Sequence, residues 1–225
     1  MSNRRGFIKS TSIASLGLIS MNQSLYSFNG FPSRKIKISL MPGTVGINVN
    51  AHELLELAIK NNFNSIYPMI NDLKKMSDSE YIEYENKMSK NSISFDISIL
   101  PVDFSQTETI FNQGLVILKD YCKVMNRIGS KGFCRWIMPT NNDLTYLKNF
   151  ELHKRRLKEC AKIIGDNGMK LGLEFVGPKT LMSRDQFSFI RTITELRELI
   201  AEINEKNVGY QLDTFHLYCA NHSVD

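Results

Sequence analysis

Two acidic residues stand near the ends of apolar runs, where a carboxylate is costly unless it binds a partner. Glu174 lies in the run Lys170–Phe175, Asp213 ends the run Val208–Asp213, and His216 follows shortly after. Oxygen ligands with one imidazole suit Mn²⁺, Mg²⁺ or Co²⁺, and also Zn²⁺ in a mixed site. These residue types therefore indicate a divalent-metal site. Salt bridges from the carboxylates to nearby Lys or Arg side chains are the competing interpretation.

A regular alternation of short apolar runs and longer helical stretches positions these residues. The helical stretches carry apolar residues three and four apart, as in Leu157, Cys160, Ala161 and Ile164. Strand starts recur every 28 to 40 residues or so, and strands that alternate with helices predict a parallel sheet. The strand-like runs are Ile36–Met41, Ser65–Tyr67, Ile93–Leu100, Gly132–Met138, Lys170–Phe175 and Val208–Asp213.

The parallel sheet is predicted to close into a barrel. No Gly-x-Gly-x-x-Gly follows the first run, so a dinucleotide-binding open sheet is disfavoured. A (β/α)8 TIM barrel needs eight units and about 250 residues, and its active site lies at the carboxyl ends of the strands. We therefore predict a barrel domain over residues 34–225 with about six of eight units present. Glu174 and Asp213, on adjacent strands, then face the same mouth.

The barrel is expected to be incomplete at its C-terminal end, with two further units beyond Asp225. Such a chain has two open sheet edges, which favour association and poor solubility. We expect little activity from these residues alone.

Capping residues mark several helix boundaries. Gly129 and Gly168 are placed to end helices. Capping-box spacing occurs at Ser77–Glu80, Ser105–Glu108 and Thr192–Glu195, with a close variant at Asn50–Glu53.

The first 33 residues are interpreted as an export signal and linker. Arg4, Arg5 and Lys9 precede a weakly apolar stretch, Ile13–Met21, that is too short to span a bilayer. Adjacent arginines before Phe and Lys resemble a twin-arginine signal, which implies export to the periplasm. We expect no stable membrane anchor.

Composition excludes some function classes. The net charge is +5, but three of the positive charges fall in the first ten residues, and no basic run contains interleaved aromatics. A nucleic-acid surface is therefore not expected. The four cysteines show no Cys-x-x-Cys spacing and are read as scattered core residues. His153 and His222 are assigned to solvent, and Arg135 to the layer of outer helices.

Two strand-end segments resemble the xylose isomerase-like TIM barrel family of sugar phosphate isomerases and epimerases. They are Leu173–Thr180 and Leu212–His216, and the similarity runs from about Ile36 to the end. Supporting segments are Ser39–Gly43, Leu100–Phe104, Trp136–Pro139 and Leu144–Leu147.

The resemblance implies specific residue roles. Glu174 and Asp213 match the family's first two metal ligands, and His216 matches a position that contacts a substrate oxygen. The other two ligands have no counterpart within the sequence. Relatives often carry an acidic residue at the end of strand two, where Tyr67 stands here as a candidate substrate contact. Trp136, the sequence's only tryptophan, either stacks on a sugar face or belongs to the core.

The implied function is a divalent-metal-dependent isomerase or epimerase that moves a proton next to the carbonyl of a small carbohydrate. Glu174 would move the proton and His216 would donate to the developing oxyanion. A dehydratase or lyase acting on keto-sugars or inositols is an alternative, as is a non-enzymatic sugar-binding barrel. An abasic-site endonuclease is disfavoured by export and by the absence of basic loops. A homo-oligomer is left open.

Overall fold

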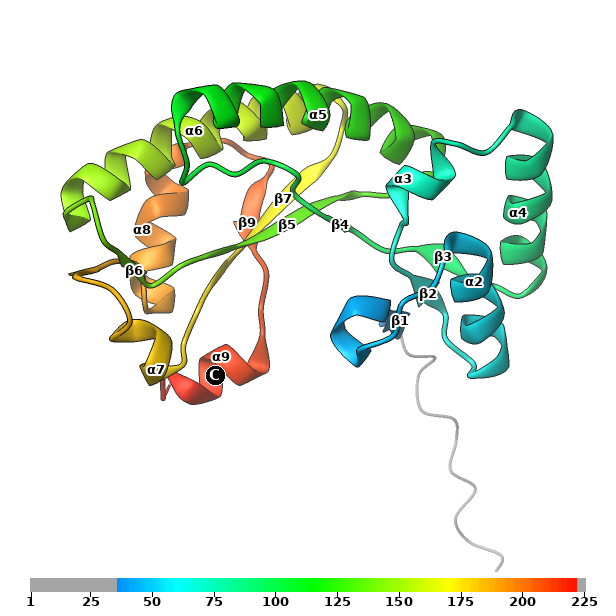
Figure 1. Ribbon diagram of the computed structural model, residues 1–225, viewed down its shortest axis with the longest axis horizontal. Coiled ribbons are helices and arrows are strands. Elements are labelled where there is room, and N and C mark those ends of the chain that lie inside the picture. Colours follow the sequence, from blue (N-terminus) through cyan, green and yellow to red (C-terminus); the bar gives the residue numbers. More distant parts are fainter. Residues whose placement is uncertain (1–35, 222–225) are drawn as a thin grey trace, which may run out of the picture. The chain divides into compact units, whose positions relative to one another are not determined.

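The computed structural model describes residues 36–221 (Figure 1). From Lys37 onward these residues form one compact unit. The predicted export signal, residues 1–33, and His222 lie outside the described residues. Within residues 36–221, no helix is both long and apolar enough to cross a membrane.

The strands of the described residues form parallel sheets of a partial (β/α)8 barrel, as the sequence predicts. One sheet has the order β1-β2-β3 and the other the order β4-β5-β7-β9. The predicted third strand is split into β3 and β4, with Asp96 and Ile97 between them. The bounds are β1 Ser39–Leu40, β2 Ser65–Ile66, β3 Ser94–Phe95, β4 Ser98–Ile99, β5 Gly132–Ile137, β7 Lys170–Phe175 and β9 Val208–Tyr210.

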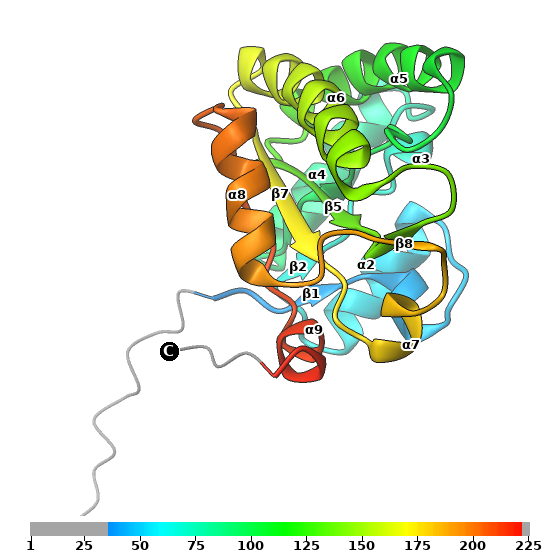
Figure 2. The ribbon, with the colours of Figure 1, turned by 90° about the vertical axis from the view of Figure 1, so that its left-hand side faces the viewer.

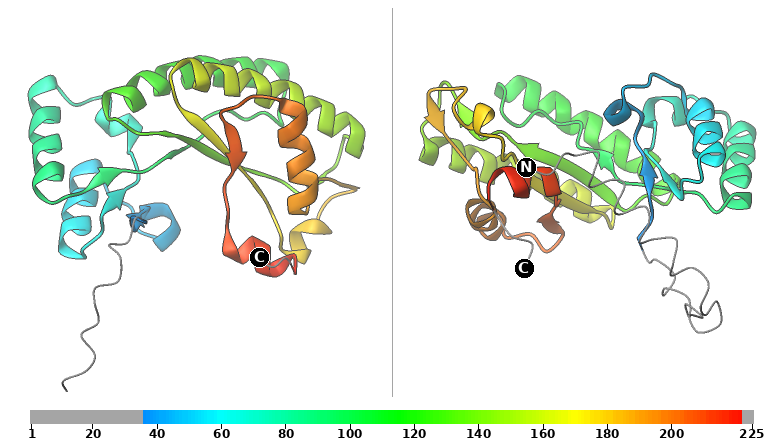
Figure 3. Two further views of the ribbon diagram at one scale, coloured as in Figure 1. Left: turned by 180° about the vertical axis from the view of Figure 1, so that it is seen from behind. Right: turned by 90° about the horizontal axis from the view of Figure 1, so that it is seen from below.

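Helices connect consecutive strands and cover one face of the larger sheet. Figures 1 and 2 show α5 and α6 along the same side of β5 and β7, with α8 beside them. Seen from behind in Figure 3, β9 forms the edge of this sheet and runs down to α9. The bounds are α2 Ala51–Lys60, α3 Ile70–Leu73, α4 Asp78–Lys90, α5 Glu108–Arg127, α6 Tyr146–Asp166, α7 Lys179–Met182, α8 Ile193–Ile203 and α9 Thr214–Cys219, with a 3-10 turn, η1, at Pro42–Val45.

The two faces of β7 differ in burial, as period-two alternation requires. Leu171, Leu173 and Phe175 are buried, in the core that the outer helices share. Gly172 and Glu174 lie on the opposite face and are only partly buried. Glu174 therefore points toward the barrel interior, away from the helix layer.

Most predicted helix boundaries are confirmed. Asn50, Ser77 and Thr192 each form a complete capping box with the glutamate three residues later. Gly129 and Gly168 follow α5 and α6 with φ of 67° and 71°, a left-handed conformation that favours glycine.

The predicted capping box at Ser105 is wrong. Thr107 caps α5 by accepting a hydrogen bond from the Ile110 amide, while Ser105 donates to Asp103 in the preceding loop. The helix therefore begins two residues later than the Ser105 box predicts.

A short antiparallel pair, which the sequence does not predict, joins two loops at the carboxyl end of the sheet. β6, Thr140–Asn141, follows β5 and pairs with β8, Phe187–Ser188, which follows β7 and α7. The Phe189 amide also donates to the Pro139 carbonyl at 2.7 Å. The β7–α8 connection therefore reaches across to the end of β5.

Candidate functional site

Three predicted residues come together at the carboxyl end of β7 and the start of α9. One ligand atom from each of Glu174, Asp213 and His216 lies within 4.8 Å of the others. His216 Nε2 is 3.0 Å from Glu174 Oε1. Among the described residues, these three form the one group of His, Cys, Asp or Glu side chains whose spacing could hold a metal ion.

The order of residues after β9 explains how Asp213 and His216 are oriented. Asp213 is the N-cap of α9, and its Oδ1 accepts from the Phe215 amide at 2.7 Å and the His216 amide at 3.4 Å. This capping fixes one carboxylate oxygen and leaves the second for a ligand. His216, in the first turn of α9, is thereby held beside the same carboxylate.

A glycine lets the exit of β7 touch α9. A Cβ added at Gly177 would lie 2.2 Å from the His216 carbonyl oxygen, a distance that real Cβ atoms do not show. Only glycine therefore allows this approach without movement of the backbone. Because Glu174 lies three residues before Gly177 and His216 contributes the contacted carbonyl, the close approach sets the spacing of the cluster.

The electrostatics of the cluster favour a bound cation. Burial, and then the neighbouring carboxylate of Asp213, raise the pKa of Glu174 to about 7. His216 Nδ1 is buried and has no hydrogen-bond partner within the described part of the chain. Two carboxylates that repel each other, with an imidazole beside them, fit a divalent metal, which would hold the carboxylates ionised.

Trp136 lies on the strand next to this cluster, and Tyr67 lines a cavity of its own. Trp136 pairs in register with Glu174 on the neighbouring strand, and 38% of its surface is exposed. Tyr67 follows β2, its hydroxyl 3.3 Å from Ser98 Oγ, and it lines a cavity of about 350 Å³ with Asp103 and Arg135. Arg135, which lines that cavity, also stacks on Trp136.

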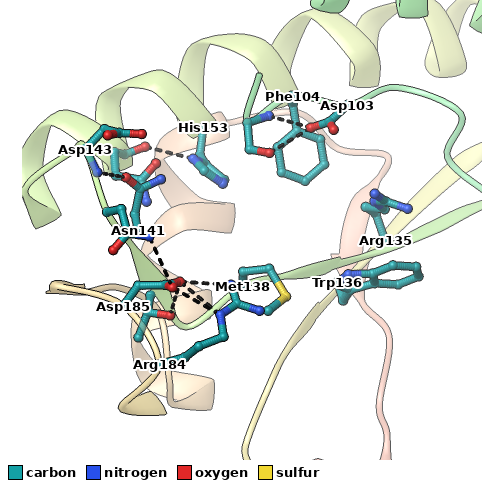
Figure 4. A pocket seen from close by; sticks show the side chains of 14 residues that line it. Asp103, Phe104, Arg135, Trp136, Met138, Asn141, Asp143, His153, Arg184 and Asp185 are labelled. Carbon is teal, nitrogen blue, oxygen red and sulfur yellow. Dashed lines mark hydrogen bonds and ion pairs between the residues drawn. The ribbon is translucent and has the colours of Figure 1, made fainter. Parts of the chain in front are cut away.

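A second cavity, of about 240 Å³, lies between the ends of β4 and β5, the start of α6 and the β6–β8 pair. We call it the α6 cavity. Figure 4 shows Phe104 and His153 on one side of it, Asp185 and Arg184 on the opposite side, and Arg135 with Trp136 at one end. The Arg135 guanidinium stacks on the Trp136 ring at 4.1 Å, and burial lowers the pKa of Arg135.

The assignment of His153 to solvent is wrong. His153 is 4% exposed, its Nδ1 donates to the Asn149 carbonyl at 2.9 Å, and its ring packs against Phe104 and Phe189. Burial lowers its pKa to about 4, so the imidazole is neutral. The apolar stripe of α6 carried the missing signal, because steps of four residues back from Leu157 reach His153 and then Asn149.

Other assignments have mixed outcomes. Arg135 pairs in register with Leu173, on the helix-facing side as expected, but it also lines both cavities. Cys122 and Cys160 are buried core residues as predicted, whereas Cys134 and Cys219 are only partly buried; all four are free thiols.

Comparison with known proteins gives a family and a fold. A family model described as "Xylose isomerase-like TIM barrel" matches residues 55–224. No curated protein matches the chain. Among solved structures, a xylose isomerase domain protein from Alicyclobacillus acidocaldarius is similar with a TM-score of 0.72 and 21% identity, over 83% of this chain and 66% of that one.

Two further solved structures, one with a bound zinc atom and one of an epimerase, are also similar to the chain. The IOLI protein, solved with a zinc atom, gives a TM-score of 0.66 and 22% identity over 84% of this chain and 66% of its own. A D-psicose 3-epimerase, solved in the presence of D-fructose, gives 0.61 and 16% identity over 78% of this chain and 62% of its own. The chain thus spans less than two thirds of the length of these relatives. With a family model matched over most of its length and the same fold in solved structures, the chain belongs to the xylose isomerase-like TIM barrel family.

Proposed function

We propose that Glu174, Asp213 and His216 form part of a divalent-metal centre of a sugar isomerase or epimerase. The observation that carries this proposal is the convergence of two carboxylates and one imidazole within 4.8 Å at the carboxyl ends of adjacent strands. In this fold that edge holds the chemistry. Mn²⁺, Mg²⁺, Co²⁺ and Zn²⁺ all suit such a donor set.

A bound divalent ion supplies Lewis-acid stabilisation of the negative charge that develops on oxygen when a proton leaves the adjacent carbon. In the proposal, Glu174 removes and returns that proton, from a position that is partly buried and excludes much of the water. Asp213 holds its place through the cap of α9. His216 holds Glu174 by the 3.0 Å contact and stands where a substrate oxygen can accept its proton.

Two structural relatives support a carbohydrate substrate by their names, a D-psicose 3-epimerase and an L-ribulose 3-epimerase. The name of a third relative describes a probable 3-DHS dehydratase. Removal of a proton next to a carbonyl is the first step that both reaction types share. We therefore propose proton transfer next to a carbonyl, with epimerisation as the outcome, and elimination as the alternative that product analysis separates.

The test is exchange of carbon-bound hydrogen with solvent. The full-length protein, loaded with Mn²⁺, is incubated with D-fructose in deuterium oxide, and NMR follows deuterium at the carbon next to the carbonyl. We expect incorporation by the native protein and loss of at least 100-fold in Glu174→Gln, whose amide cannot take the proton. Equal incorporation by Glu174→Gln would refute the role of Glu174. An unsaturated product without exchange would assign the elimination chemistry instead.

We also propose export, on the basis of the sequence alone, because residues 1–33 lie outside the described residues. The segment with Arg4 and Arg5 would direct the folded, metal-loaded protein to the periplasm.

A further inference from the structure

The α6 cavity contains a buried polar group that nothing in the fold uses. Asn149, on the first turn of α6, is 2% exposed, and its Oδ1 has no hydrogen-bond partner within the described residues. Burial of an unpaired amide oxygen costs free energy, about 1–3 kcal/mol, so such groups call for an explanation. Asn149 lines the α6 cavity, which gives its oxygen a place to receive a donor from a bound molecule.

Other lining groups offer both donors and acceptors. Because His153 Nδ1 donates to the Asn149 carbonyl, the neutral ring keeps Nε2 as an acceptor. Arg135 is half buried and makes no hydrogen bond or ion pair with the described residues, so its guanidinium hydrogens remain available. A ligand that fits this mixture must donate and accept at several points, as hydroxyl groups do.

The charges around the cavity disfavour an anion. The carboxylate of Asp185 is already matched by Arg184 at 2.8 Å and by Thr140 at 2.7 Å. The carboxylate of Asp103 lies near Arg135, and the carboxylate of Asp143 lines the far end of the cavity. A phosphate or carboxylate would meet as much negative as positive charge, whereas an uncharged ligand meets no such repulsion.

The apolar groups and the size suit one sugar ring. Trp136 is 38% exposed and presents aromatic surface, on which the C–H face of a sugar ring packs, while the buried Phe104 adds an apolar wall. The volume of about 240 Å³ lies below the range of roughly 300–1,000 Å³ that holds drug-sized ligands. A single ring is therefore the expected occupant.

The cavity adjoins the Glu174 cluster but is distinct from it. Trp136 connects them, since it lines the cavity and pairs in register with Glu174. Asn149 belongs to α6, which covers the helix-facing side of the sheet, while Glu174 points into the barrel. A ligand that uses both places must therefore extend past Trp136, at the end of β5, from one to the other.

We propose that the α6 cavity is a second carbohydrate subsite, which takes an uncharged ring joined to the ring that reacts at Glu174. The substrate class is then glycosides of two or more rings rather than sugar phosphates. This inference rests on the proposed function for the reacting ring. The contacts of the second ring are independent of the metal.

The single tryptophan provides the assay, because Trp136 lines the cavity and no other tryptophan contributes to the emission. Emission is followed during titration with cellobiose, maltose, lactose and trehalose, with D-glucose for comparison, in Mn²⁺ and separately in EDTA. We expect at least one disaccharide to bind in Mn²⁺ at least 10-fold more tightly than D-glucose. Inorganic phosphate should not compete.

The deciding variant is Asn149→Leu, which keeps the approximate volume and removes the unpaired oxygen. It should weaken disaccharide binding at least 10-fold, to the level of D-glucose, while the thermal midpoint stays equal or rises. The matched control is Asn112→Leu, on an exposed position of α5, which should bind like the native protein. A merely structural Asn149 would instead lower the thermal midpoint.

The inference is overturned if no disaccharide alters the emission up to its solubility limit, if phosphate competes, or if the two leucine variants bind alike. Failure of the proposed function has a different signature. Disaccharide binding would then remain in EDTA and depend on Asn149, while Mn²⁺ would add nothing and Glu174→Gln would change nothing.

Discussion

Replacing Gly177 with alanine should separate the two halves of the metal cluster. The new Cβ would lie 2.2 Å from the His216 carbonyl oxygen, whereas real Cβ contacts do not fall below 3.0 Å. Either the exit of β7 or α9 must therefore move by at least about 0.8 Å. That displacement separates Glu174 from Asp213 and His216, which travel with α9.

The expected magnitudes follow from the size of this shift. A forced methyl group in a packed contact costs typically 1–3 kcal/mol of stability. Movement of the groups that orient metal ligands lowers metal affinity by roughly 10–100-fold. Gly177→Ala should therefore lower the free energy of unfolding by about 2 kcal/mol and weaken Mn²⁺ binding at least 10-fold.

Calorimetric titration with Mn²⁺ and urea unfolding measure the two effects. The matched control is Gly209→Ala on β9, where an added Cβ meets nothing within 4 Å. It should change neither quantity by more than experimental error. If Gly177→Ala bound Mn²⁺ like the control, the close approach of β7 to α9 would not set the cluster geometry, and the reasoning would be refuted.

Three further predictions concern burial and export. His153 is neutral when folded because burial lowers its pKa from 6.5 to about 4, so the unfolded chain binds the proton more readily and the contribution of His153 to stability falls as pH drops from 6.5 toward 4. Between pH 7 and pH 5, urea unfolding should show the native protein losing about 2 kcal/mol relative to His153→Gln; an identical pH dependence of the two proteins would contradict this. Arg156→Met should cost about 3 kcal/mol in the same assay, because the buried guanidinium donates to the carbonyls of Phe104 at 2.8 Å and Gln106 at 2.6 Å, and an effect below 1 kcal/mol would exclude that role. Replacing Arg4 and Arg5 with lysines should retain the protein in the cytoplasm of a bacterial host, as fractionation measures, and periplasmic delivery of the variant would rule out a twin-arginine signal.

The alternation of strands and helices could be predicted because the spacing of apolar residues within each element depends only on neighbouring residues. Each strand and each long helix carries its own apolar pattern, and three capping boxes mark helix starts by residue type alone. The convergence of Glu174 and Asp213 followed from strand ends in a parallel sheet. These inferences need no knowledge of contacts between distant segments.

The β6–β8 pair and the α6 cavity could not be predicted, because they depend on segments about 45 residues apart. Thr140 and Asp185 meet only once the β7–α8 connection has crossed the end of β5. Asn149 and His153 were visible as an extension of the α6 stripe, but polar residues at such positions are usually taken as the end of the buried face. The structure shows that the stripe continues and becomes the wall of a cavity.

The central claim is that Glu174 and Asp213, with His216 beside them, belong to a divalent-metal site. Electron paramagnetic resonance of Mn²⁺, titrated with protein, measures the free ion directly. The account predicts stoichiometric loss of the free signal with the native protein, and at least 100-fold weaker binding when Glu174→Gln and Asp213→Asn are combined. Equal binding by the native protein and this double variant would contradict it.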